Sequence, residues 1–334
     1  MYNNKYEVII LSLMKIDLLN EKDYFNEMEN TVKPYLNKYE HSSYLLSDDN
    51  NKLFYKYYLI ENPKANIVIS HGLNEFSEKY NEMMYYFLKR NFNVFIIEHR
   101  GHGHSYREVE DTSISHINSY NEYVSDFNCF LNKIVLDKTQ NLPLYLYAHS
   151  MGGAIATLFL MKYPQIFDNA ILTAPMIYPK TANVPSGITK FMTKMFSVLG
   201  KGKERVFVHK EFNPNAPFET SNSTSLIRFN YFMNIKRNNK LYFNSSTSYR
   251  WVNESLKITK TMLNRKNCQK IKTKVFMIVA ESDKTVKKEE QIRFVKMVNN
   301  AKFKEIKGSK HEIYMSNNKV LKEYLEEIFL FFEN

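Results

Sequence analysis

The sequence is poor in cysteine, glycine and proline, and it contains no long hydrophobic run. Its 334 residues include two cysteines, nine glycines and nine prolines. Two cysteines are too few for a disulfide scaffold or a four-cysteine metal site, and the scarcity of glycine and proline excludes collagen-like and low-complexity chains. No apolar run approaches the ~20 residues of a membrane-spanning helix. The 44% hydrophobic and 24% charged residues are typical of a globular protein, and we expect a cytoplasmic one with reduced cysteines.

The N-terminus contains a short apolar run, Val8–Met14, which raises the question of a targeting signal. A secretory signal has a basic start, an apolar core and a small-residue cleavage site. Glu7 precedes the run, and no such cleavage site follows it. We therefore predict a short helix or strand that lies on the body of the protein, and either Met1 or Met14 could be the initiator.

Five of the nine glycines follow three short apolar runs. The runs are Asn66–Ser70, Asn93–Ile97 and Leu144–Ala148. They are rich in β-branched and aromatic residues and are apolar on both faces, which is typical of parallel strands covered by helices on both sides. Helical patterns between the runs complete βαβ units. The sequence therefore predicts a ligand site at the C-terminal strand ends, where the glycines are.

The alternation of strands and helices stops between Pro175 and about Cys268, a stretch that holds five of the nine prolines. Strand-like runs resume at Lys274–Ala280 and Ala301–Lys307. We therefore divide the chain into an N-terminal extension (1–44), an α/β core (45–175 and 269–334) and an inserted, mostly helical cap (176–268). The expected fold class is α/β, with a mostly parallel central sheet and helices on both faces.

A candidate nucleophile, Ser150, lies between a predicted strand and a predicted helix in the segment 148–153 (AHSMGG). A sharp turn at this place exposes the serine hydroxyl above the sheet, and small residues two positions before and after it let the turn close. Here these residues are Ala148, where glycine is usual, and Gly152. The helix that begins at Met151 directs its free N–H groups towards a developing oxyanion.

A serine nucleophile needs a base and an acid that orients the base. In this architecture the acid and then the histidine follow the serine at later strand ends. Asp283 and His311 occupy such positions, and no other histidine follows His209. Glu281 and Asp168 are rival acids, and we favour Asp283 because it lies in the loop beyond the strand end.

A second N–H group for the oxyanion would come from Leu73, which follows His71 and Gly72 at an earlier strand end. With the N–H of Met151 it would form an oxyanion hole, in which each donor contributes about 3–4 kcal/mol.

Three histidines after another strand, His99, His102 and His104, form a cluster that zinc could bind. They lie in a glycine turn, and the sequence fixes no further cysteine or acidic ligand nearby. We therefore favour a structural turn and predict no metal site.

These motifs resemble the bacterial lysophospholipase and monoacylglycerol lipase group of the α/β-hydrolase superfamily. The matching segments are 71–72 (HG), 98–105 (EHRGHGHS), 148–154 (AHSMGGA) and, in the cap, 247–255 (TSYRWVNES). The resemblance covers roughly residues 45–330, and Asp283 and His311 fall where that family keeps its acid and base. It implies a serine carboxylic ester hydrolase that acts on lysophospholipids or monoacylglycerols through an acyl-enzyme on Ser150, without a metal or an organic cofactor. The segment 71–76 reads HGLNEF, where monoacylglycerol lipases often carry H-G-x-G-E-H, and this departure favours lysophospholipids.

Three other functions fit parts of the sequence. A serine aminopeptidase or iminopeptidase would need acidic residues in the cap to hold a substrate ammonium, and the cap has only four glutamates. A non-catalytic ligand-binding protein with the hydrolase fold usually lacks a triad member, whereas all three candidates are present here. Nucleic-acid binding would suit the net charge of +11, but no nucleic-acid motif accompanies that charge.

The cap carries both the basic charge of the chain and an apolar helix face. It contains sixteen Lys or Arg and four Glu, so the rest of the chain is close to neutral. We therefore expect peripheral contact with an anionic membrane surface, where each nearby Lys or Arg contributes about 1 kcal/mol. Met195 and Phe196 on the apolar face, together with Trp251, are candidates for contact with the acyl chain of a lipid ester.

Overall fold

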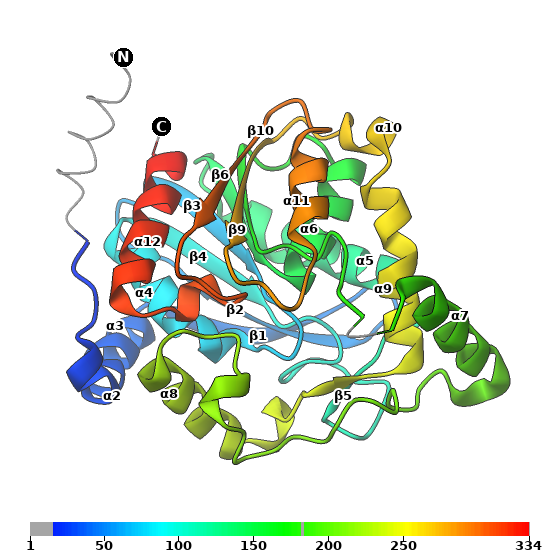
Figure 1. Ribbon diagram of the computed structural model, residues 1–334. Helices are drawn as coiled ribbons and strands as arrows, with labels where there is room; N and C mark the ends of the chain where they lie inside the picture. Colours follow the sequence, from blue (N-terminus) through cyan, green and yellow to red (C-terminus); the bar gives the residue numbers. More distant parts are fainter. Residues whose placement is uncertain (1–15, 182–183, 334) are drawn as a thin grey trace.

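The computed structural model describes residues 16–181 and 184–333, and its centre is an eight-stranded, mostly parallel sheet (Figure 1). The strand order across the sheet is β1-β2-β4-β3-β6-β7-β9-β10. β2 pairs antiparallel with β1 and β4, and all other neighbours pair parallel. The strands are β1 (Glu40–Leu46), β2 (Lys52–Tyr58), β3 (Ala65–Ser70), β4 (Phe92–Ile97), β6 (Leu144–His149), β7 (Asn169–Thr173), β9 (Lys274–Ala280) and β10 (Ala301–Ile306). The mostly parallel sheet predicted from the sequence is confirmed.

Strand β3 shows how the sheet is buried on both faces. Ile67 and Ile69 pack in the hydrophobic core on one side, and Val68 between them packs in the core on the other side. Successive side chains of a strand point to opposite faces, so a strand buried on both sides is apolar throughout. The first core is covered by α4 (Asn81–Lys89) and α12 (Asn318–Phe332), and the second by α5 (Tyr120–Phe130), α6 (Met151–Lys162) and α11 (Lys288–Val295).

The sheet begins earlier in the chain than the sequence pattern indicates. β1 includes residues 40–44, which we assigned from the sequence to the N-terminal extension. It is one of the two edge strands, paired only with β2, and most of its side chains are exposed. A polar edge strand lacks the apolar run by which inner strands are recognised. Before it lie η1 (Glu21–Asp23), α2 (Tyr24–Glu27), η2 (Met28–Val32) and α3 (Lys33–Asn37).

Residues 176–268 form a mostly helical insertion between β7 and β9, which we call the cap. Its helices are α7 (Ser186–Phe196), α8 (Leu226–Arg237), α9 (Tyr249–Met262) and α10 (Arg265–Cys268). Two short parallel strands, β5 (Ile114–Ser115) and β8 (Ser246–Thr247), join it to the segment after β4. The buried Arg228 of α8 also donates to both carboxylate oxygens of Glu82 in α4, at 2.7 and 2.8 Å. The cap is therefore fixed to the core by backbone pairing and by a buried ion pair.

The remaining helical elements are single turns. They are η3 (Ser77–Tyr80), η4 (Leu131–Val135), η5 (Leu136–Lys138), η6 (Ser197–Lys201), η7 (Phe218–Thr220), η8 (Lys240–Tyr242) and η9 (Ile313–Met315). Within residues 16–181 and 184–333, no helix has both the length and the hydropathy needed to cross a membrane. The predicted element at Val8–Met14, with the choice between Met1 and Met14, lies outside the described residues.

Candidate active site

Ser150 occupies a sharp turn between β6 and α6. Its backbone adopts φ 51° and ψ −113°, a conformation that residues other than glycine rarely adopt. Two close approaches explain the small residues after it: a Cβ on Gly152 would overlap the carbonyl oxygen of Ser70, and a Cβ on Gly153 would lie 2.5 Å from Cβ of Pro175. The backbone strain is therefore held by tight packing on both sides of the turn, which keeps the serine hydroxyl in a fixed position.

The structure brings the three candidate triad residues together. Ser150 Oγ lies 2.8 Å from His311 Nε2, and His311 Nδ1 lies 2.7 Å from Asp283 Oδ2. The other carboxylate oxygen of Asp283 accepts hydrogen bonds from the backbone N–H groups of Thr285 and Val286, at 2.7 and 3.0 Å. Burial alone would raise the pKa of Asp283, but the imidazole of His311 and these hydrogen bonds outweigh burial and hold the pKa below its usual value. Asp283 therefore stays ionised beside the imidazole.

The two rival acids point elsewhere. Glu281 accepts a hydrogen bond from the backbone N–H of Gly308 at 2.9 Å and pairs with Lys307. Asp168 accepts a hydrogen bond from the backbone N–H of Leu144, at the opposite end of β6 from Ser150. Of the three carboxylates, Asp283 alone has a hydrogen bond to His311 among the described contacts.

The two residues predicted for the oxyanion hole lie close to Ser150 in the sequence or line the same cavity. Met151 is the first residue of α6, so its N–H belongs to the first turn, whose N–H groups have no intrahelical acceptor. Leu73, three residues beyond the end of β3, lines the cavity that also contains Ser150 and His311. This placement fits the predicted role, which remains a prediction.

The sequence analysis missed a buried carboxylate that joins three parts of the site. Glu75 is 2% exposed. One of its oxygens accepts hydrogen bonds from the backbone N–H of Gly72 at 2.6 Å and from the hydroxyl of Tyr80 at 2.5 Å. The other accepts from the hydroxyl of Tyr314 at 2.6 Å and from Lys79 Nζ at 3.1 Å. The motif in segment 71–76 does not indicate this role, and no sequence pattern reveals Tyr314 as a partner, because it lies 239 residues away.

Glu75 stays ionised, whereas burial keeps its histidine neighbour neutral. Burial alone would raise the pKa of Glu75, but the charge of Lys79 and hydrogen bonds from two tyrosine hydroxyls hold the pKa far below its usual value. His149, whose Nε2 lies 3.6 Å from Glu75, has its pKa lowered by burial to about 3. The residue before Ser150 is therefore a neutral imidazole beside a stable carboxylate.

The clustered histidines each bind a different partner. His99 Nε2 lies 2.9 Å from Ser70 Oγ, and His102 Nε2 lies 3.2 Å from Ser115 Oγ. The backbone N–H of His104 donates to the carboxylate of Glu98, and the imidazole ring of His104 contacts the same carboxylate through Nδ1. These rings hold the loop after β4 against its neighbours, which is the structural turn favoured from the sequence.

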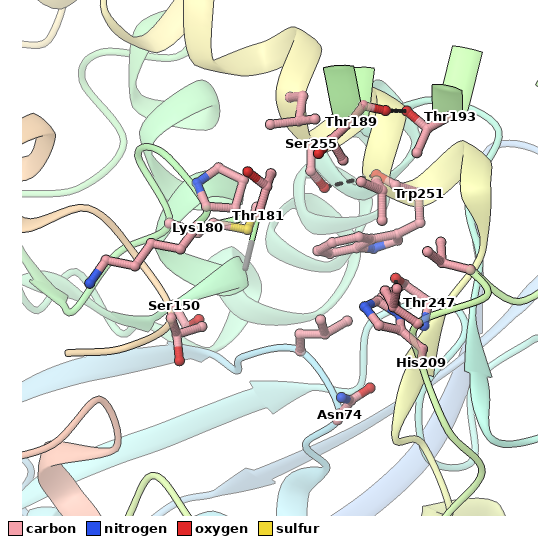
Figure 2. A pocket seen from close by; sticks show the side chains of 18 of the residues that line it. Asn74, Ser150, Lys180, Thr181, Thr189, Thr193, His209, Thr247, Trp251 and Ser255 are labelled. Atoms are coloured by element: carbon pink, nitrogen blue, oxygen red, sulfur yellow. Dashed lines mark hydrogen bonds between the residues drawn. The ribbon is translucent and has the colours of Figure 1, made fainter. Parts of the chain in front are cut away.

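A cavity of about 470 Å³ extends from Ser150 and His311 towards the cap. Figure 2 shows Ser150 and Lys180 on one side of it, and Trp251, Thr247 and His209 on the other. Thr189 and Thr193 of α7, with Ser255 of α9, also line it. Such a space, next to a nucleophile and lined mainly by cap residues, suits a substrate with an extended chain.

The three residues predicted to contact the acyl chain differ in position. Trp251 lines the cavity, and its indole N–H donates to the hydroxyl of Tyr123 at 3.2 Å. Met195 and Phe196 are not among the lining residues. Met195 is 39% exposed, and Phe196 stacks on Tyr249 with ring centroids 4.5 Å apart. Helical spacing identified the right helix but the wrong side of it, since α7 turns Met192 towards the cavity instead.

The fold and the serine turn define the class of protein, an α/β-hydrolase of the serine type. The sequence profile of the Hydrolase_4 family, described as Serine aminopeptidase, S33, matches residues 61–318. This match covers more than half of the chain, and the protein belongs to this family.

Relatives with known names agree with that class. The chain is 26% identical to the probable lysophospholipase L2 of Haemophilus influenzae over 297 residues, which cover 86% of this chain and 90% of that protein. It is 43% identical to lysophospholipase L2 of Escherichia coli (strain K12) over 110 residues, 33% of this chain and 32% of that protein. This second match spans about a third of the E. coli protein. Human monoglyceride lipase is 33% identical over 168 residues, 48% of this chain and 50% of that protein. The protein is a serine hydrolase, as the sequence predicts, and its resemblance to lysophospholipases and monoacylglycerol lipases is confirmed.

Solved structures share the fold at low sequence identity. A soluble variant of monoglyceride lipase from Saccharomyces cerevisiae superposes with a TM-score of 0.70 at 14% identity, covering 87% of this chain and 94% of that chain. A carboxyl esterase from Bacillus coagulans gives a TM-score of 0.70 at 18% identity, covering 89% and 98%. These similarities confirm the α/β-hydrolase fold.

Proposed function

We propose that the protein hydrolyses the carboxylic ester bond of lipids with a single acyl chain, lysophospholipids or monoacylglycerols, through an acyl-enzyme on Ser150. The observation that carries this proposal is the hydrogen-bonded chain from Ser150 through His311 to Asp283 beside a cavity of about 470 Å³. The relatives named lysophospholipase L2 and monoglyceride lipase support the choice of substrate class.

The proposed reaction has two steps. His311 Nε2 takes the proton of Ser150 Oγ as the oxygen attacks the ester carbonyl, and Asp283 stabilises the resulting imidazolium. The N–H groups of Leu73 and Met151 hold the oxyanion. His311 then protonates the leaving glycerol-type alcohol and activates the water that releases the fatty acid. All proton transfers use side chains of this protein, so the proposed reaction needs no cofactor.

An aminopeptidase activity, suggested by the family's description, needs an uncommitted carboxylate to hold a substrate ammonium. Two acidic residues line the described cavity, Glu75 and Glu312. Both pair with Lys79, at 3.1 and 2.8 Å. Because both carboxylates are already paired with Lys79, neither is free for a substrate ammonium, and we favour an uncharged ester over an aminoacyl substrate. The intact serine–histidine–aspartate chain also favours an enzyme over a non-catalytic ligand-binding protein.

Activity on a small set of substrates tests this proposal. The purified protein and its Ser150→Ala variant would be assayed on lysophosphatidylcholine, a monoacylglycerol, a p-nitrophenyl ester and an aminoacyl anilide. We expect fatty acid release from at least one of the lipids, lost in the variant, and no comparable cleavage of the anilide. Faster turnover of the anilide than of every ester would support the aminopeptidase instead.

A further inference from the structure

Two half-buried polar side chains in the cavity, Asn74 and His209, have hydrogen-bond donors that meet no acceptor within residues 16–181 and 184–333. Hydroxyl groups on the cap side of the cavity differ in this respect. Thr193 and Ser255 donate to backbone carbonyls of their own helices, at 2.8 and 2.9 Å. Polar groups inside a protein are normally paired in this way. Unpaired donors in the cavity of the nucleophile therefore indicate a group of the ligand.

The contacts of His209 determine which of its ring nitrogens carries the proton. Its Nδ1 accepts a hydrogen bond from the backbone N–H of Thr247 at 3.2 Å, and the hydroxyl of Thr247 lies 3.1 Å from the same nitrogen. Burial lowers the pKa of His209, so the ring is neutral at pH 7. A neutral imidazole has a single N–H, and because Nδ1 is the acceptor, the proton is on Nε2. His209 therefore offers one N–H donor to a ligand.

Asn74 presents its carboxamide from an uncommon backbone conformation. Its φ is 62°, a value that asparagine and glycine adopt more readily than other residues. The amide oxygen accepts a long hydrogen bond from the hydroxyl of Ser115, at 3.4 Å. The same hydroxyl is fixed by Asn244, whose amide donates to it at 2.9 Å. The oxygen of Asn74 is therefore turned towards Ser115, which leaves the two N–H groups of Nδ2 for the cavity.

The two short strands β5 and β8 keep these donors close together. Ser115, the contact of Asn74, pairs through its backbone with Thr247, which is the contact of His209. Figure 2 shows Asn74, Thr247 and His209 on the same side of the cavity. We call Asn74 and His209 the donor pair. The fold thus places three N–H groups and no competing acceptor at one place in the cavity.

The charged residues of the cavity favour an anionic acceptor for the donor pair. Lys180 and Lys284 line the cavity, and neither has an ion pair in the described part of the chain. The two carboxylates that line it, Glu75 and Glu312, both pair with Lys79. Hydrogen bonds to an ionised acceptor are about twice as strong as those between neutral groups. An ionised phosphate therefore suits this site better than a hydroxyl group, whose proton would meet no unpaired carboxylate there.

We propose that the donor pair binds a phosphate oxygen of the substrate head group and makes the enzyme selective for lysophospholipids over monoacylglycerols. This selectivity rests on the proposed function, because it concerns the same ester hydrolysis at Ser150. The phosphate oxygens of a phosphodiester are acceptors only, so they match a site that offers only donors. A site built to hydrogen-bond one group rejects an analogue that lacks it, because the donors of the site are then left unpaired.

Two short-chain substrates test this selectivity, a lysophosphatidylcholine and a monoacylglycerol that carry the same acyl chain and are monomeric in water. The measured quantity is the ratio of their kcat/KM values. Asn74→Gly keeps the backbone conformation and removes the carboxamide. His209→Asn keeps an acceptor for the N–H of Thr247 and removes the Nε2 donor. We expect each substitution to lower the ratio at least about tenfold in favour of the monoacylglycerol.

Two further variants control for changes in folding. Asn62→Gly makes the same substitution at another asparagine with positive φ, 52°, which is exposed and does not line the cavity. His209→Gln places an amide N–H where Nε2 lies, so we expect it to keep the ratio of the parent enzyme. An unchanged ratio in Asn74→Gly and His209→Asn, or equal losses on both substrates, would overturn the proposal.

Calorimetric titration of the Ser150→Ala protein separates head-group binding from turnover. The probes are glycerophosphocholine and inorganic phosphate. We expect glycerophosphocholine to bind more tightly than inorganic phosphate, and at least about tenfold more weakly when Asn74→Gly is added. No binding of glycerophosphocholine, or equal affinity for the two probes, would overturn the assignment to a head group. If the parent enzyme hydrolyses no lipid but glycerophosphocholine binds with this dependence on Asn74, the proposed function fails and the donor pair stands.

Discussion

The carboxylate of Glu75 accepts a hydrogen bond at 2.6 Å from the backbone N–H of Gly72, the residue immediately before the predicted oxyanion donor Leu73. The same carboxylate binds Tyr314, three residues after His311. Its charge also lies beside His149, which precedes Ser150. One buried side chain thus connects the three loops that carry the oxyanion donor, the base and the nucleophile, and we expect it to set their relative positions.

Replacing Glu75 with glutamine should lower kcat more than it changes KM. The amide cannot accept all four hydrogen bonds, so the loops shift, and a displacement of about 1 Å can cost ~100-fold in rate. Leaving Lys79 less well paired should also lower the free energy of unfolding by about 3 kcal/mol. Steady-state kinetics on a soluble ester and chemical denaturation measure the two effects. Glu78→Gln is the control, since Glu78 binds Tyr242 instead. A folded Glu75→Gln enzyme with normal kcat would show that the carboxylate does not position the site.

Asp283→Asn should reduce kcat by about 10⁴, because an amide at this position favours the wrong tautomer of His311. Glu281→Gln should leave kcat close to that of the parent enzyme, since Glu281 faces Gly308 and Lys307. Kinetics of both variants on the same ester measure the difference. The reverse order of effects would make Glu281 the acid.

Acid should destabilise the protein from about pH 6.5 downwards, where histidine side chains in an unfolded chain take up protons. Burial lowers the pKa values of His71, His99 and His102, and it lowers the pKa of His149 to about 3. These side chains stay neutral in the fold but take up protons in the unfolded chain near pH 6.5. The unfolded state then binds more protons, so the free energy of unfolding falls as the pH falls.

Urea denaturation at several pH values between about 7.5 and 4.5 measures this slope, to which each such histidine adds ~1.4 kcal/mol per pH unit. His149→Gln should reduce the slope by one such contribution, whatever its effect on stability at neutral pH. A slope unchanged by this substitution would mean that His149 takes up a proton in the folded protein.

Met192→Trp should reduce the affinity for long acyl chains, because Met192 lines the cavity and a larger side chain narrows it. We expect KM for a long-chain lysophospholipid to rise at least about tenfold, with little change for p-nitrophenyl acetate. Met195→Trp, three residues further along α7, is the matched control because Met195 faces outwards. Equal effects of the two substitutions on both esters would show that the acyl chain lies elsewhere.

The fold and the proximity of the three triad candidates could be predicted because both depend on local patterns. Apolar runs identified the inner strands, two of which, β6 and β9, precede Ser150 and Asp283, while His311 follows the edge strand β10 in the order that the fold requires. Strand β1 was missed because an exposed edge strand carries no such run. The local sequence therefore identifies a strand reliably where the strand is buried on both faces of the sheet.

The orientation of α7 could not be predicted because both candidate faces are apolar. The side that faces the cavity also includes Thr189 and Thr193, polar residues that would normally indicate solvent. Thr193 satisfies its hydroxyl within the helix, by donating to the carbonyl of Thr189 at 2.8 Å. The linking position of Glu75 could not be predicted either, because two of its neighbours, His149 and Tyr314, come from distant segments.

The central claim, an acyl-enzyme on Ser150, is tested most directly by peptide mass mapping of the protein trapped during turnover of a long-chain ester. The account predicts a fatty acyl group on the peptide that contains Ser150, no such adduct in Ser150→Ala, and a loss of about 10⁶ in kcat in that variant. Alkylation of Cys129 and Cys268, both buried, should leave the adduct and the activity unchanged. An acyl group on another residue, or fatty acid release by Ser150→Ala at the rate of the parent enzyme, would contradict it.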